Sequence, residues 1–106
     1  MSGCLVLHRG DNRFAVELEE AVEVAQAGRI HECPGLAPGW RGFVLAGDTL
    51  APVYDSAPGA AGGELLVSAE HDGFRVAVVA DRIERAAARP RDARPLHALL
   101  AALAPR

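Results

Sequence analysis

Apolar and polar residues alternate along several short stretches of this chain, which is the pattern of half-buried β-strands. The first two stretches cover residues 4–8 and 14–18. Between them lie Gly10, Asp11 and Asn12, which are typical turn residues. The beginning of the chain is therefore predicted to form a β-hairpin.

The stretch from Trp40 to Asp55 predicts a further hairpin. Gly42 and Gly47 bracket its first apolar run. A turn then leads into a second run, which Pro52 and Asp55 close. Alternation, a tight reversal and a proline at the end of a strand together indicate two antiparallel strands.

A third hairpin is predicted from residues 64–70 and 74–80, with the turn at residues 71–73. The pair Asp72 and Gly73 favours this turn because glycine readily adopts a positive φ angle. Residues 83–87 either prolong the second strand or begin another one.

A helical spacing of apolar residues occurs early in the chain and predicts a short amphipathic helix of at most two turns. The positions i, i+3, i+4 and i+7 are occupied by Leu18, Ala21, Val22 and Ala25. The other side of this helix carries Glu19, Glu20 and Glu23. Acidic residues in a first turn also suit the dipole of a helix.

The same spacing recurs near the end of the chain and predicts a helix over residues 95–104. Its apolar positions are Leu96, Leu99, Leu100 and Leu103. Pro95 suits the first turn and Pro105 ends the helix.

The remaining segments are predicted to be connections within one domain that spans residues 1–106. Residues 26–39 are rich in glycine and proline and form a loop. Residues 56–63 are expected to be a flexible loop, and residues 85–94 an arginine-rich connector.

Composition and charge exclude several functions. Half of the 106 residues are apolar and 24% are charged, as in a globular domain. The net charge of −3 lacks the basic excess of a dedicated nucleic-acid binder. Five arginines between Arg82 and Arg94 could contact RNA or an acidic partner. Their segment, interrupted by Pro90 and without aromatic platforms, carries only +3, which favours a solvated face.

The cysteines and the hydropathy profile favour a cytoplasmic protein. Cys4 and Cys33 are too few for a secreted disulfide scaffold, so both are expected to be free thiols. No signal peptide is recognisable, and no apolar stretch approaches the ~20 residues that span a bilayer. We therefore expect no insertion into a membrane.

No set of residues predicts catalysis, a metal ion or a cofactor. The side chains of the consecutive residues His31, Glu32 and Cys33 do not converge easily on one ion. The other histidines lie on unrelated elements: His8, His71 and His97. The serines lie outside any G-x-S-x-G motif. Cys33 with His31 could form a reactive thiol but lacks an oriented third group. The chain is therefore interpreted as a binding module.

The order of several motifs resembles the CheW-like family, the adaptor domain of bacterial chemotaxis arrays. The family's V-x-E-V helix is matched at residues 22–24 and its proline-bearing loop at Pro34 and Pro38. The family's hairpin motif is matched at Gly42, Gly47, Pro52, Val53 and Asp55. Residues 78–83 match the family's late V-D-x-V strand.

This resemblance implies a mainly β fold: a pair of small SH3-like barrels, the second one reduced. It implies a non-catalytic adaptor that couples a histidine kinase to chemoreceptor-like proteins and needs no cofactor. Partner contacts are expected at Arg41, Val44, Ala46, Leu18 and Val22. A structural role in turns and strand ends is expected for Gly42, Gly47, Pro52, Asp55 and Asp81.

The chain departs from the family at two points. The segment between Gly42 and Gly47 is one residue shorter, and Ala46 replaces the family's arginine. The strands that follow the late motif in longer members are replaced by the arginine-rich connector and the last helix. Two alternative functions remain open. One is a divergent scaffold in another two-component or motility system, and the other is a ligand-binding or thiol-dependent barrel that uses Cys33 and His31. With either function, a homodimer could complete the shortened fold.

Overall fold

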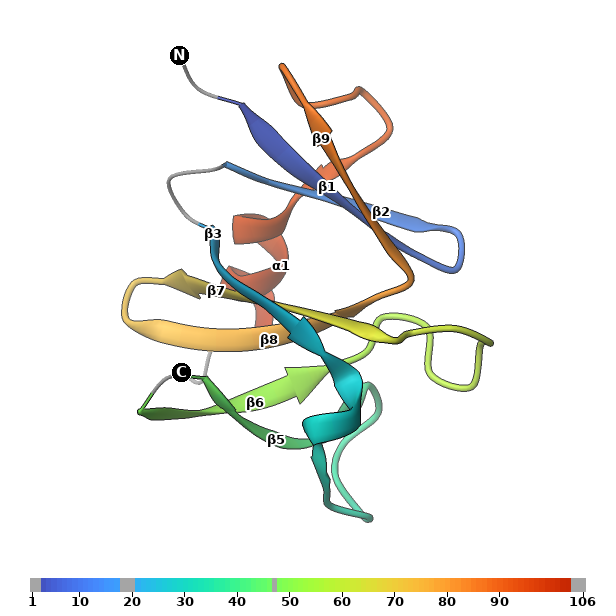
Figure 1. The fold of residues 1–106 in the computed structure, drawn as a ribbon, viewed down its shortest axis with the longest axis vertical. Helices are drawn as coiled ribbons and strands as arrows, with labels where there is room; N and C mark the ends of the chain where they lie inside the picture. Colours follow the sequence, from blue (N-terminus) through green and yellow to red (C-terminus); the bar gives the residue numbers. More distant parts are fainter. Residues whose placement is uncertain (1–2, 18–20, 47, 104–106) are drawn as a thin grey trace.

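The computed structural model describes residues 3–17, 21–46 and 48–103. These residues form two β-sheets and a single α-helix, α1 (Leu96–Leu103) (Figure 1). The mainly β class predicted from the alternation is therefore confirmed. One sheet has four strands and the other has six.

The four-stranded sheet joins the two ends of the chain. Its strands lie in the order β10 (Arg94–Pro95), β2 (Asn12–Glu17), β1 (Cys4–Arg9) and β9 (Arg82–Ala86). β1 and β2 form the predicted first hairpin. β9 pairs with β1 as a separate strand and does not prolong its predecessor, because a bend at Asp81 separates the two.

The six-stranded sheet contains the two later hairpins. Its strands lie in the order β3 (Ala21–Gln26), β7 (Leu65–His71), β8 (Phe74–Ala80), β6 (Thr49–Tyr54), β5 (Trp40–Ala46) and β4 (His31–Glu32). β5 with β6 and β7 with β8 are the predicted antiparallel pairs. A short parallel pairing of β6 with β8 joins the two hairpins into one sheet.

The helix predicted around residues 18–25 is wrong. Residues 21–26 are instead strand β3, antiparallel to β7, and a 3-10 turn, η1 (Ala27–Arg29), follows. Leu18, Glu19 and Glu20 lie outside the described residues. A two-turn helix is marginal by itself, whereas β7 offers an edge for pairing and the β-branched Val22 and Val24 suit a strand.

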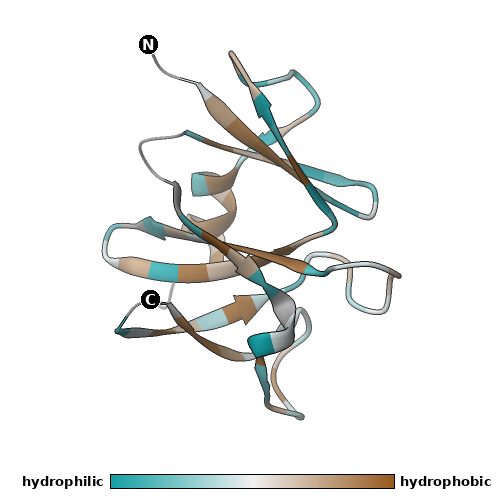
Figure 2. Cartoon of the chain, in the orientation of Figure 1, coloured by the Kyte–Doolittle hydropathy of each residue, from teal (hydrophilic) through white to brown (hydrophobic). Residues whose placement is uncertain are grey.

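The main core lies between the two sheets and α1 (Figure 2). Alternate residues of β1, β2, β7 and β8 point into it, and α1 adds Leu96 and Leu100. α1 packs against β7 of one sheet and β2 of the other, so the predicted last helix is confirmed and helps to join the layers. A second cluster fills the other face of the six-stranded sheet, around Val53, Leu66 and Val79.

Gly42 allows β5 to approach β4. Its φ angle is +153°, and the pairing of β5 with β6 shifts register between Trp40 and Gly42. An added Cβ atom would lie 2.0 Å from the carbonyl oxygen of His31. A glycine is therefore required at this position for both its backbone angle and the space around it.

Gly42→Ala is expected to lower the free energy of unfolding by about 2–4 kcal/mol, because it strains the backbone and pushes β4 away. Gly28→Ala is the matched control, since no atom lies within 4 Å of an added Cβ there. Urea denaturation followed by circular dichroism measures both. Equal losses at Gly28 and Gly42 would contradict this account.

Candidate functional site

Arg9 forms the most conspicuous charged cluster of the molecule. The residue is 2% exposed and lies at the end of β1. Its Nε and Nη2 atoms donate to the two carboxylate oxygens of Asp55, at 2.8 and 3.0 Å. Its Nη1 atom donates to Oδ1 of Asp81 at 2.7 Å. We call these three residues the Arg9 clasp.

Residues 56–63 wrap around the guanidinium of the clasp. The carbonyl oxygens of Ala57, Ala60 and Ala61 accept hydrogen bonds from Arg9 at 2.9–3.1 Å. A Cβ atom on Gly63, whose φ angle is +78°, would lie 3.1 Å from Cζ of Arg9. The composition predicts a flexible loop here, and the structure adds that three of its backbone carbonyl groups accept hydrogen bonds from the buried cation.

The clasp shifts the pKa of each of its members. Burial would raise the pKa of Asp55, but hydrogen bonds from Arg9 and from the amide of Ala57 lower it below its usual range. The amide of Gly10 and then Arg9 lower the pKa of Asp81. The hydrogen bonds from Arg9 to Asp55 raise the pKa of Arg9.

The geometry of the clasp indicates a structural role and not a binding site for a ligand. Every nitrogen of the Arg9 guanidinium already donates to an oxygen of this chain. Asp55 follows β6 and Asp81 follows β8, so the clasp fixes the ends of three strands from both sheets. A perturbed pKa can mark an active site, but here it follows from a structural ion-pair network.

Cys33 forms no hydrogen bond with a basic side chain of the described residues. Its Sγ atom donates to the backbone carbonyl oxygen of His31, at 3.7 Å, and not to the imidazole ring. Among the described residues, no three side chains of His, Cys, Asp or Glu gather where they could hold a metal ion. No helix within the described ranges is long and apolar enough to cross a bilayer.

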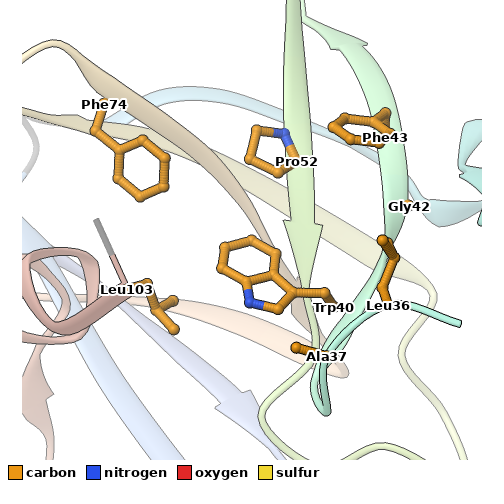
Figure 3. A pocket seen from close by; sticks show the side chains of 8 residues that line it. All are labelled: Leu36, Ala37, Trp40, Gly42, Phe43, Pro52, Phe74 and Leu103. Carbon is orange, nitrogen blue, oxygen red and sulfur yellow. The ribbon is translucent and has the colours of Figure 1, made fainter. Parts of the chain in front are cut away.

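An apolar hollow of about 330 Å³ opens between the β5–β6 hairpin, β8 and α1 (Figure 3). Phe74 of β8 and Leu103 of α1 line one side, and Trp40 and Pro52 line the other. The remaining lining residues are Leu36, Ala37, Gly42 and Phe43. The edge of the Trp40 ring meets Tyr54, with 5.2 Å between ring centroids, which fixes the indole at the wall of the hollow.

The apolar surface continues from the hollow toward the tip of the β5–β6 hairpin. Phe43 is paired with Pro52, and Leu45 with Leu50. Residues two positions apart along a strand point to the same face of the sheet, and so do residues paired directly across two strands. These four side chains therefore form a continuous row. We call this row the apolar ladder. Leu45 is 64% exposed and Leu50 is 61% exposed, and large apolar side chains exposed side by side are typical of a binding surface.

The predicted contact residue Val44 lies on the opposite face. It is 4% exposed and packs in the second core cluster with Ala51 and Val53. Because adjacent residues of a strand point to opposite faces, the prediction missed the exposed face by one position. The signal was available in the alternation itself, since the residues next to Val44 are Phe43 and Leu45.

The other residues predicted to contact a partner lie on different elements or outside the described residues. Arg41 is partly exposed on β5, where its Nη2 atom lies 2.5 Å from Oε1 of Glu32. Ala46 ends β5, and Val22 lies in β3 instead of a helix. Leu18 and Gly47 lie outside the described residues. Of the predicted contacts whose side chains are described, Val44 is therefore buried whereas Arg41 is partly exposed, and the two do not form one exposed surface.

The comparisons with known proteins identify the fold. The structure is similar to the crystal structure of the scaffolding protein TtCheW from Thermoanaerobacter tengcongensis, with a TM-score of 0.66 and 14% sequence identity. The match covers 80% of this chain and 63% of that one, so the chain spans less than two thirds of its neighbour's length. The chain has a CheW-like fold. No protein-family profile and no curated protein sequence matches it.

Asp55→Asn is expected to lower the free energy of unfolding by about 3–5 kcal/mol, because it leaves the buried Arg9 without a balancing charge on Asp55. Asp92→Asn removes a carboxylate from an exposed pair with Arg13 and should cost only about 0–1 kcal/mol. Urea denaturation at neutral pH measures both variants. A loss at Asp55 no larger than that at Asp92 would show that the clasp does not hold the sheets together.

The clasp also predicts how stability depends on pH. The lowered pKa values of Asp55 and Asp81 mean that the unfolded chain binds more protons in acid than the folded one. The stabilisation that these two carboxylates give the folded protein is complete above pH about 4. It is lost as the pH falls through their folded-state pKa values. Asp81→Asn should therefore flatten the loss of stability below pH 4, as measured by urea titrations over a pH series. An unchanged slope would contradict this assignment.

Proposed function

We propose that this chain is a non-catalytic, cytoplasmic adaptor that binds signalling proteins through the apolar ladder. The observation that carries this proposal is the continuity of the ladder with the apolar hollow. Two exposed leucines at the hairpin tip lead into a recess lined by Trp40 and Phe74. A partner that covers both would bury the leucines and gain free energy from their removal from water.

The similarity to a scaffolding protein supports the same class of function. The fold by itself does not specify an activity, so the argument depends on the exposed surface. Among the described residues, the hollow is lined by apolar side chains without a titratable group, which suits the association of proteins better than a chemical reaction. The motifs of the CheW-like family make a histidine kinase or a chemoreceptor-like protein the proposed partner.

The replacement of the family's arginine by Ala46 bears on which partner is bound. A contact that depends on that guanidinium is lost in this chain, whereas the ladder needs no charge. Recognition by apolar burial at the hairpin could therefore persist with the kinase or be redirected to another two-component or motility protein.

Replacing both Leu45 and Leu50 by serine is expected to weaken partner binding about 30-fold, which corresponds to about 2 kcal/mol for two partly exposed leucines. The partner to use is the regulatory domain of the chemotaxis histidine kinase from the same organism. Isothermal titration calorimetry measures the dissociation constant.

Val24→Ser is the matched control. Val24 is 50% exposed, but it lies on β3 at the opposite edge of the same sheet. This variant should bind like the unchanged protein. Failure of the unchanged protein to bind any chemotaxis kinase or receptor would refute the array role, and binding to another signalling protein would identify the divergent scaffold instead.

A further inference from the structure

β9, the connector after it and the first residue of β10 carry arginines that form no ion pair with another described residue. Within the described part of the chain, no salt bridge reaches any of the five arginines of residues 82–94: Arg82, Arg85, Arg89, Arg91 and Arg94. All five are exposed. We call these five residues the arginine band. It is unexpected in a chain whose net charge is −3.

The two acidic residues of this segment compensate the band only in part. The charge of Arg82 acts on Glu84 without forming an ion pair. Glu84 accepts a hydrogen bond from His8 at 2.6 Å and lies 3.7 Å from Nη2 of Arg13. Asp92 forms an ion pair with the same Arg13. Arg13 belongs to β2, so it compensates both carboxylates from outside the segment. Most of the positive charge of the band therefore remains available to a partner.

The backbone of β9 is available as well. β9 lies at the end of the four-stranded sheet and pairs only with β1 among the described strands (Figure 1). Alternate amide and carbonyl groups of its outer edge therefore have no partner strand, and such an edge can accept one more strand. Charged residues protect a free edge against unwanted pairing, but they also attract a strand of opposite charge.

The register of β9 defines what such a strand must carry. Arg82 is paired with His8, and Arg85 with Leu5, so the two arginines are three residues apart and point to opposite faces of the sheet. Glu84 lies between them on the face of Arg82 and repels an acidic residue opposite to it. The complementary strand therefore has acidic residues at positions i and i+3 and a neutral residue opposite Glu84.

We propose that β9 binds an acidic, extended segment of a partner protein, which adds to the four-stranded sheet as a fifth strand. Backbone hydrogen bonds to β9 hold the segment, and Arg82 and Arg85 select its acidic residues. Nucleic acid fits this surface less well, because Phe14, the ring over which Arg94 lies at 5.1 Å, is buried and offers no stacking platform. This surface lies on the other sheet from the apolar ladder and extends the proposed function.

The probe is an acetylated, amidated peptide, Thr-Glu-Val-Thr-Glu-Val-Thr, which carries its glutamates at i and i+3. Binding to the full chain is measured by fluorescence anisotropy at low salt. Arg85→Glu is expected to weaken binding at least about tenfold. Arg29→Glu is the matched control, because it makes the same change of charge at an exposed position in η1, and it should change binding less than about twofold.

Three further measurements distinguish strand addition from general attraction of charges. The isomeric peptide Thr-Glu-Glu-Val-Thr-Val-Thr should bind more weakly, because only one of its glutamates can face an arginine of β9. The first peptide should slow amide hydrogen exchange in β9, and methylation of its central amide nitrogens should abolish binding. The double serine variant of Leu45 and Leu50 should bind the peptide unchanged, which separates this proposal from the proposed function.

Several results would overturn the proposal. They are a dissociation constant above about 1 mM for the first peptide, equal losses with Arg85→Glu and Arg29→Glu, or equal affinity for both peptides. Tighter binding of an oligothymidylate of matched charge than of the peptide would instead identify the band as a nucleic-acid surface.

Discussion

The buried cation of Arg9 is the contact on which the arrangement of the two sheets depends. A charge that is removed from water is tolerated only when every polar atom around it is paired. Arg9 meets this condition with Asp55, Asp81 and three backbone carbonyl groups. These partners come from the ends of β6 and β8 and from the loop between β6 and β7, so the clasp fixes the position of the β5–β6 hairpin against the first hairpin.

The proposed binding surface follows from this arrangement. The β5–β6 hairpin has one face in the second core cluster and the other toward α1 and Phe74. The paired residues of the hairpin alternate between these two faces, so Val44 and Ala51 are buried while Leu45 and Leu50 are exposed. An adaptor needs such a surface: apolar enough to bind, yet carried on strands that the rest of the fold holds in place.

The two proposed surfaces use different physical interactions and lie on different sheets. The apolar ladder binds by removing leucine side chains from water, and this contribution is little affected by salt. The arginine band attracts by charge and orients by backbone pairing, and its contribution weakens as salt screens it. The two proposed surfaces together would allow two partners to bind at once.

The sequence by itself determined the strands of the three hairpins and the last helix, because alternation, the Asp-Gly pair and the positions of proline are local signals that the tertiary contacts reinforce. It also identified Gly42 and the hairpin that carries the ladder. Only the tertiary structure decided that residues 21–26 form a strand, since their pairing partner β7 begins about forty residues later. It also decided which face of β5 is exposed and that Arg9, which precedes the turn of the first hairpin, lies buried in the clasp. These features depend on residues distant in the chain, whose proximity no local pattern contains.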